Sequence, residues 1–158
     1  MFGDQSNEYI RSLVSVGNCY IFKENYEVAE EYVTKALDVY QTSRLENDTT
    51  LKSILYALGN IYSEEGNFDK AKDLYTRSIE LCKDDLNQYM HICLLDALGW
   101  NYYKMKDYNS AILYGGKAVD IILRESAEIK YANAAIYRRL LLHACNNIGN
   151  CAFTLEHS

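Results

Sequence analysis

Apolar residues recur at helical spacing along nearly the whole chain. In one stretch, Leu55, Leu58 and Tyr62 stand three and four positions apart, which places them on one face of a helix. A second stripe of the same period runs over residues 71–79, after the turn signal EEGN at 64–67. The pattern predicts pairs of helices joined by short turns, and therefore an all-α fold. We expect about seven helices, near residues 5–23, 26–44, 49–65, 68–83, 87–105, 108–125 and 128–154.

The same pattern of residues occurs three times. Segments 15–37, 57–79 and 97–119 align without gaps, and a partial fourth copy, NNIGNCAF, carries Gly149. Five positions match in the three full copies: a glycine, a tyrosine, an aromatic residue, an alanine and a small residue. These positions are Gly17, Gly59, Gly99; Tyr20, Tyr62, Tyr102; Tyr26, Phe68, Tyr108; Ala29, Ala71, Ala111; and Ala36, Ser78, Ala118. The chain is therefore a tandem repeat.

The small residues in this pattern are explained by close packing between helices. A glycine inside a helix costs about 1 kcal/mol relative to alanine, so its recurrence requires a compensating contact. Glycine and alanine let two antiparallel helices approach closely, because a larger side chain would hold the backbones apart. Asn25, Asn67 and Asp107 each precede the second helix of a copy, and we expect them to be its N-cap.

These positions resemble the tetratricopeptide repeat, whose pattern is W-x₂-L-G-x₂-Y…A-x₃-F…P. Leu58-Gly59-x₂-Tyr62 and Ala71-x₃-Tyr75 carry the resemblance most closely, and it covers nearly the whole chain. Some positions depart from the pattern. Leucines replace the tryptophan, the terminal proline is missing, and the repeats lie 42 and 40 residues apart instead of about 34. Repeats of the HEAT type have a similar period and stay open as an alternative.

The resemblance implies a single helical-repeat domain over residues 1–158, folded as a right-handed α-α superhelix. Its repeats would span 5–44, 49–83 and 87–125, with a partial one at 128–154. In this family the first helices of the pairs line a concave groove, and the residue after the glycine faces that groove. The implied peptide-binding residues are Asn18, Asn60, Trp100 and Asn150, with Tyr56, Asp96, Tyr103 and Asn146 beside them. Arg138, Arg139 and His143 would add positive charge near one end.

A structural interpretation of the same asparagines stays open. An amide carries both a donor and an acceptor, so it can bind the main chain of an extended peptide. It can equally bond to a neighbouring helix and order the stack. For the last predicted helix, which lacks a partner, two explanations also remain. Either the chain is a fragment of a longer array, or the helix is a natural cap or packs against a second copy in a homodimer.

Composition narrows the classes of function. The formal charge of −6 argues against nucleic-acid binding, which usually uses a basic face. The sequence contains no run of 18 apolar residues, so we expect no membrane span. The first ten residues do not resemble a secretion signal. Five cysteines, an odd number without close pairing, are typical of reduced thiols, so we expect a cytoplasmic protein.

The titratable residues do not form a catalytic pattern. His91 and Cys93 are two positions apart, as are His143 and Cys145, so neither pair shares a helix face or has zinc-ligand spacing. We expect no catalytic residue, no metal and no cofactor, and therefore no enzyme. The predicted function is a scaffold that binds a protein or peptide segment in its groove. The alternative is the peptide-sensing domain of a bacterial transcriptional or signalling regulator.

Overall fold

The computed structural model describes residues 2–43, 45, 47–82, 88–126 and 134–156. These residues form seven helices and no strand, which confirms the all-α prediction. The helices are α1 (Phe2–Phe22), α2 (Tyr26–Thr42), α3 (Asp48–Glu64), α4 (Phe68–Glu80), α5 (Gln88–Lys104), α6 (Tyr108–Ser126) and α7 (Ala134–Glu156). Their ends lie close to the predicted ends, and the predicted start of the last helix, 128–133, lies outside the described residues. Within the described part of the chain, no helix combines the length and apolar character that a membrane crossing requires.

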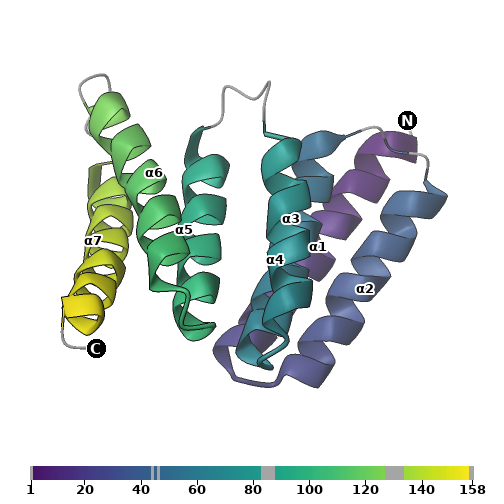
Figure 1. The fold of residues 1–158 in the computed structure, drawn as a ribbon. Helices are drawn as coiled ribbons and strands as arrows, with labels where there is room; N and C mark the ends of the chain where they lie inside the picture. Colours follow the sequence, from purple (N-terminus) through teal and green to yellow (C-terminus); the bar gives the residue numbers. More distant parts are fainter. Residues whose placement is uncertain (1, 44, 46, 83–87, 127–133, 157–158) are drawn as a thin grey trace. The chain divides into compact units, whose positions relative to one another are not determined.

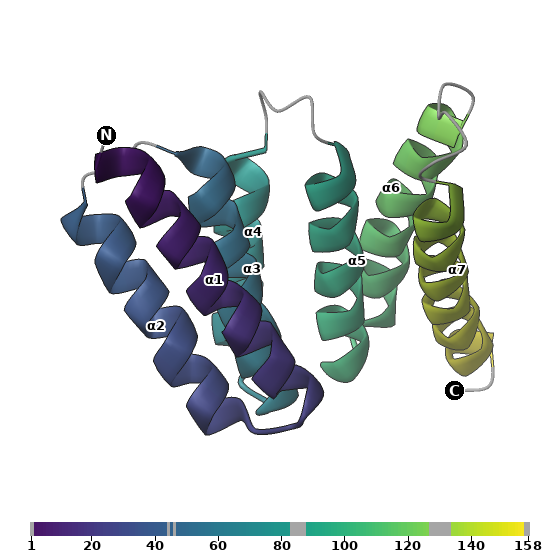
Figure 2. The ribbon, with the colours of Figure 1, turned by 180° about the vertical axis from the view of Figure 1, so that it is seen from behind.

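The chain divides into two compact units, residues 1–81 and 82–158. The first unit contains α1–α4, and the second contains α5–α7 (Figure 1). In the first unit, α1 packs against α2 and α3, and α3 packs against α4. Figure 2 shows this unit from behind, with α1 beside α2. In the second unit, α5 packs against α6 and α7, and α6 packs against α7.

The turns inside the three helix pairs share one backbone conformation. A residue in the left-handed region stands two positions after the end of each first helix: Glu24 at φ 57°, Gly66 at φ 82° and Lys106 at φ 63°. Left-handed backbone costs about 1–2 kcal/mol for a residue with a side chain, so only Gly66 adopts it without strain. In every turn the following N–H bonds to the carbonyl of the repeated tyrosine, for example from Asn67 to Tyr62 at 2.8 Å. The repeat therefore fixes the turn as well as the helices.

Two of the three predicted N-caps use their side chains. Asn25 Oδ1 accepts from the backbone N–H of Val28 at 3.3 Å, and Asp107 Oδ1 accepts from that of Ser110 at 3.1 Å. Asn67 occupies the N-cap position of α4, as predicted, although its side chain makes no capping bond. Asp69 supplies a negative charge to the first turn of α4, where it complements the helix dipole.

The three repeated glycines lie against the partner helix of their pair, as predicted. A Cβ atom on Gly17 would stand 2.5 Å from Val33 Cγ2, and one on Gly59 would stand 2.5 Å from Tyr75 Cε1. A Cβ on Gly99 would meet the backbone nitrogen of Gly115 at 3.2 Å. The opposing residue thus ranges from glycine to tyrosine, although its position is constant. Beside these contacts each unit buries its own apolar residues, including Ile10, Val33, Ile54 and Ile61 in the first and Ile92, Leu98, Ile122 and Cys151 in the second.

Candidate functional site

In the first unit, the predicted binding residues lie on α1 and α3. Asn18, Tyr56 and Asn60 are all half-buried. The Tyr75 hydroxyl donates a 2.7 Å hydrogen bond to Asn60 Oδ1, and the rings of Tyr56 and Tyr75 have centroids 6.2 Å apart. The amide oxygen of Asn60 is therefore used inside the α3–α4 pair. This contact supports the structural interpretation for Asn60, and the residue's role in binding stays a prediction.

In the second unit, a buried carboxylate joins α5 to α7. Asp96 on α5 is 8% exposed, and its Oδ2 lies 2.7 Å from Nδ1 of His143 on α7. The amide nitrogen of Asn147, one turn further along α7, lies 3.2 Å from the same ring nitrogen. The His143 side chain nevertheless remains 53% exposed. One edge of the imidazole is thus fixed by the protein, while the ring stays accessible.

The electrostatics of Asp96 are a balance between burial and pairing. Burial raises the pKa of this carboxyl above its ordinary value, and the charge and hydrogen bond of His143 act in the opposite direction. The second oxygen, Oδ1, is buried and accepts no hydrogen bond within the described part of the chain. An acceptor left in this state costs free energy, which a well-packed core residue would avoid. Asp96 therefore has the environment of a site residue.

An aromatic row continues from His143 along α5. The Trp100 ring lies 6.1 Å from the His143 ring and stacks on Tyr103 at 5.1 Å with an interplanar angle of 18°. The Lys104 ammonium stands 5.7 Å from the centre of the Trp100 ring. Trp100 and Tyr103 are half-buried, and Asn146 and Asn150 are exposed on α7. We call the surface formed by Asp96, Trp100, Tyr103, His143, Asn146, Asn147 and Asn150 the α5–α7 face.

The sequence predicted most members of this face but not their contacts. Asp96, Trp100, Tyr103, Asn146 and Asn150 were expected at the binding surface, and His143 was expected to contribute charge nearby. The pairing of His143 with Asp96 was missed because the two residues are 47 positions apart. Asn147 was missed as well, although its spacing of four from His143 puts both on one helix face. Arg138 was expected beside them, but its side chain lies outside the described residues.

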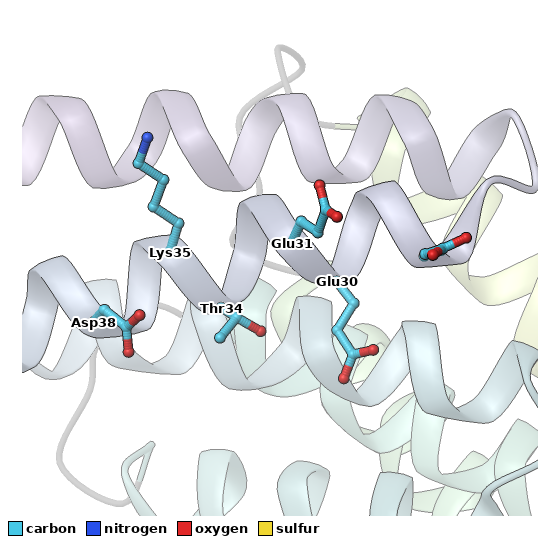
Figure 3. A pocket seen from close by; sticks show the side chains of 6 residues that line it. Glu30, Glu31, Thr34, Lys35 and Asp38 are labelled. Atoms are coloured by element: carbon cyan, nitrogen blue, oxygen red, sulfur yellow. The ribbon is translucent and has the colours of Figure 1, made fainter.

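Acidic residues gather elsewhere, on α2. Figure 3 shows a shallow hollow lined by Glu30, Glu31, Thr34, Lys35 and Asp38, all on this one helix. The Tyr62 hydroxyl donates a hydrogen bond to Glu30, which ties this carboxylate to α3. Most of the lining is exposed, so the hollow is a hydrated acidic surface. In the described residues, no group of three or more His, Cys, Asp and Glu side chains is placed to hold a metal ion.

The thiols of Cys93 on α5 and Cys151 on α7 are poor nucleophiles. Burial raises the pKa of Cys93, and it also raises the pKa of Cys151. A catalytic cysteine needs the opposite shift, because the thiolate is the reactive form. Burial also lowers the pKa of His91, on the same helix as Cys93. His91 and Cys93 are therefore better suited to packing than to catalysis.

Comparisons with known proteins agree with the repeat pattern. Two models described as tetratricopeptide repeats match the chain, one over residues 50–124 and the other over residues 10–42. The matched stretches together cover more than half of the chain and include all three repeated glycines. A comparison with curated proteins gives no match. Repeats of this family are generally scaffolds for interactions between proteins. The glycine contacts, the shared turns and the two matches establish that the chain belongs to the tetratricopeptide repeat family.

Proposed function

We propose that the protein is a non-enzymatic scaffold that binds an extended protein segment, with the α5–α7 face as the main contact. The observation that carries this proposal is the row His143–Trp100–Tyr103, an accessible aromatic surface that adjoins a buried carboxylate. Partly exposed tryptophan and tyrosine rings are the side chains that most often dominate binding energy at protein interfaces. Family membership supports the same class of function.

The groups on this face define the kind of ligand. The Trp100 and Tyr103 rings suit an apolar or aromatic side chain, and the exposed amides of Asn146 and Asn150 can bond to its main chain. Because His143 Nδ1 is engaged with Asp96, Nε2 is the ring nitrogen left for a ligand. Exposed Arg139 lies one turn away on α7 and favours an acidic group nearby. We therefore expect a segment with an apolar anchor followed by an acidic residue.

In the first unit, Asn18, Tyr56 and Asn60 form a second candidate surface on α1 and α3. Its amides can bond to a peptide main chain in the same way, with Asn60 restricted by its bond from Tyr75. Nothing in the described residues favours the alternative role, a peptide-sensing domain of a regulator, over scaffolding.

Alanine replacement of Trp100 tests the main contact. Peptide arrays and pulldowns would first supply a ligand segment, and calorimetry would then compare its affinity for the wild-type chain and for Trp100→Ala. We expect the variant to lose about thirtyfold or more in affinity, as for a residue central to an interface. The matched control is Tyr114→Ala on α6, whose ring stacks on Tyr102 at 5.4 Å and is also half-buried. If the two variants lose affinity equally while both stay helical by circular dichroism, the α5–α7 face is not the main contact.

A further inference from the structure

The outer face of α7 has the residue pattern of a first helix, but among the described residues no helix packs over it as one packs over each of the other first helices. We define this face by Leu142, Cys145, Gly149 and Phe153. Aligned on the repeated glycine, it corresponds to Ile10, Leu13, Gly17 and Ile21 in α1, to Lys52, Leu55, Gly59 and Ser63 in α3, and to Ile92, Leu95, Gly99 and Tyr103 in α5. Ten of those twelve residues are buried, and Ile21 and Tyr103 are half-buried.

On α7 the same four positions are exposed. Leu142 is 61% exposed and Phe153 is 64% exposed, while Cys145 and Gly149 are also accessible. A Cβ atom on Gly149 would have no neighbouring heavy atom within 4 Å, whereas one on Gly17 or Gly59 would collide with the partner helix. The face is thus shaped to receive a closely packed antiparallel helix, and no described helix of this chain occupies it.

We infer that the occupant is α7 of a second copy of this chain, packed antiparallel across a twofold axis. If Cys145 lies opposite Gly149 of the second copy, Leu142 comes opposite Phe153 of that copy. The spacing makes every contact occur twice, which is the requirement for a closed twofold interface. The two glycines are thereby covered by small thiol side chains, and all four large apolar side chains leave the solvent.

The size of the opposing residue agrees with the helix pairs inside the chain. Opposite their glycines, these pairs place Gly115, Val33 and Tyr75. Cysteine lies between glycine and valine in size, so Cys145 falls within the range that this packing accepts.

Charge selects the antiparallel orientation. Exposed Arg139 lies near the start of α7, and exposed Glu156 is its last residue. The antiparallel register brings Arg139 level with Glu156 of the second copy, at both ends of the pair. A parallel pair would instead place arginine beside arginine and glutamate beside glutamate, which is unfavourable. The expected dimer is held by one helix pair, below about 1,200 Å² of buried surface, so it exchanges with the monomer.

Sedimentation velocity of the full chain over about a hundredfold range of concentration tests the dimer. We expect the apparent mass to approach twice that of the monomer at the highest concentrations. Gly149→Leu should remove this rise, because the new side chain holds the two helices apart. Gly116→Leu on α6 is the matched control, since a Cβ there also has no neighbour within 4 Å, and it should dimerise like the wild type. A wild-type chain that stays monomeric throughout, or a Gly149→Leu variant that still dimerises, overturns the inference.

Two further variants test the orientation. Arg139→Glu should weaken dimerisation by about tenfold, and combining it with Glu156→Arg should restore it, because the ion pairs are re-formed with reversed sign. In a Cys19→Ser background, oxidation of Gly149→Cys should link it to Cys145 of the second copy, while Gly116→Cys should give no linked dimer. Failure of the charge reversal to rescue, or linkage in the Gly116→Cys control alone, contradicts the antiparallel pair. Because Trp100 on α5 takes no part in the helix pair, Trp100→Ala should dimerise like the wild type, so a failure of the proposed ligand binding is distinguishable from a failure of the dimer.

Discussion

At the residue scale, the contact of Gly59 with Tyr75 shows why the repeat requires a glycine. Tyr75 is fully buried against the glycine backbone, and its hydroxyl donates to Asn60 Oδ1 at 2.7 Å. Burial raises the pKa of this hydroxyl above its ordinary value, so it stays a donor throughout the physiological range. The ring thus joins α3 and α4 through one apolar contact and one polar contact.

Replacing Gly59 by alanine should destabilise the protein. The new Cβ would lie 2.5 Å from Tyr75 Cε1, so the ring must move and strain its bond to Asn60. Overpacking of this kind costs about 1–3 kcal/mol, which exceeds the gain of about 1 kcal/mol in helix propensity. Denaturant unfolding would measure the difference. Gly116→Ala, where the added Cβ meets nothing, should instead stabilise by up to about 1 kcal/mol. Equal effects in the two variants would mean that Gly59 does not set the approach of α3 and α4.

At the scale of elements, the link between α5 and α7 should respond to pH. The pKa of Asp96 is raised in the folded state, chiefly by burial. A carboxyl with a raised pKa contributes stability that is fully present below its unfolded pKa, about 3.9, and that is lost as pH rises through the folded value. As the pH rises above about 3.9, the wild type should therefore lose free energy of unfolding relative to Asp96→Asn. Urea unfolding at a series of pH values would measure it.

Asp107 provides a control, because its contribution to stability should depend on pH in the opposite direction to that of Asp96. Hydrogen bonds from Ser110 lower the pKa of this N-cap carboxyl at the start of α6. Its contribution is present above the unfolded pKa and is lost as pH falls through the folded value. The free energy of unfolding of Asp107→Asn should therefore fall furthest below that of the wild type near neutral pH. The difference should become smaller in acid. Curves of the same sign for the two variants would contradict the environment described for Asp96.

The sequence predicted the elements better than the contacts between them. Helical periodicity and the glycine–tyrosine–alanine pattern depend on residues within one helix pair, so the helices and the caps at Asn25 and Asp107 could be inferred. The bond from Tyr75 to Asn60 and the pairing of Asp96 with His143 depend on how two side chains meet across a helix interface. Periodicity places a residue on a face, but it does not determine which residue lies opposite.

At the scale of the whole molecule, the first unit should fold without the second. Residues 1–81 form a compact unit that contains two complete helix pairs and both glycine contacts, Gly17 with Val33 and Gly59 with Tyr75. Ile10, Val33, Ile54 and Ile61 are fully buried and belong to one cluster, against which partly buried apolar residues of the same unit pack. In repeat proteins, stability is approximately a sum of each repeat and its nearest neighbours, so two adjacent pairs can be stable alone.

A fragment of residues 1–81 should therefore be helical and unfold cooperatively, although at a lower temperature than the full chain. Its length exceeds the roughly 40 residues below which domains usually need disulfides or metals. Because its core is small, we expect its free energy of unfolding to be low. Circular dichroism with thermal melting would measure both properties. The Gly59→Ala change should lower the melting temperature of the fragment as it does that of the full chain, because Tyr75 and Asn60 both lie inside it. A fragment without helical signal, or a broad melt that Gly59→Ala leaves unchanged, would mean that the first unit depends on the rest of the chain for its core.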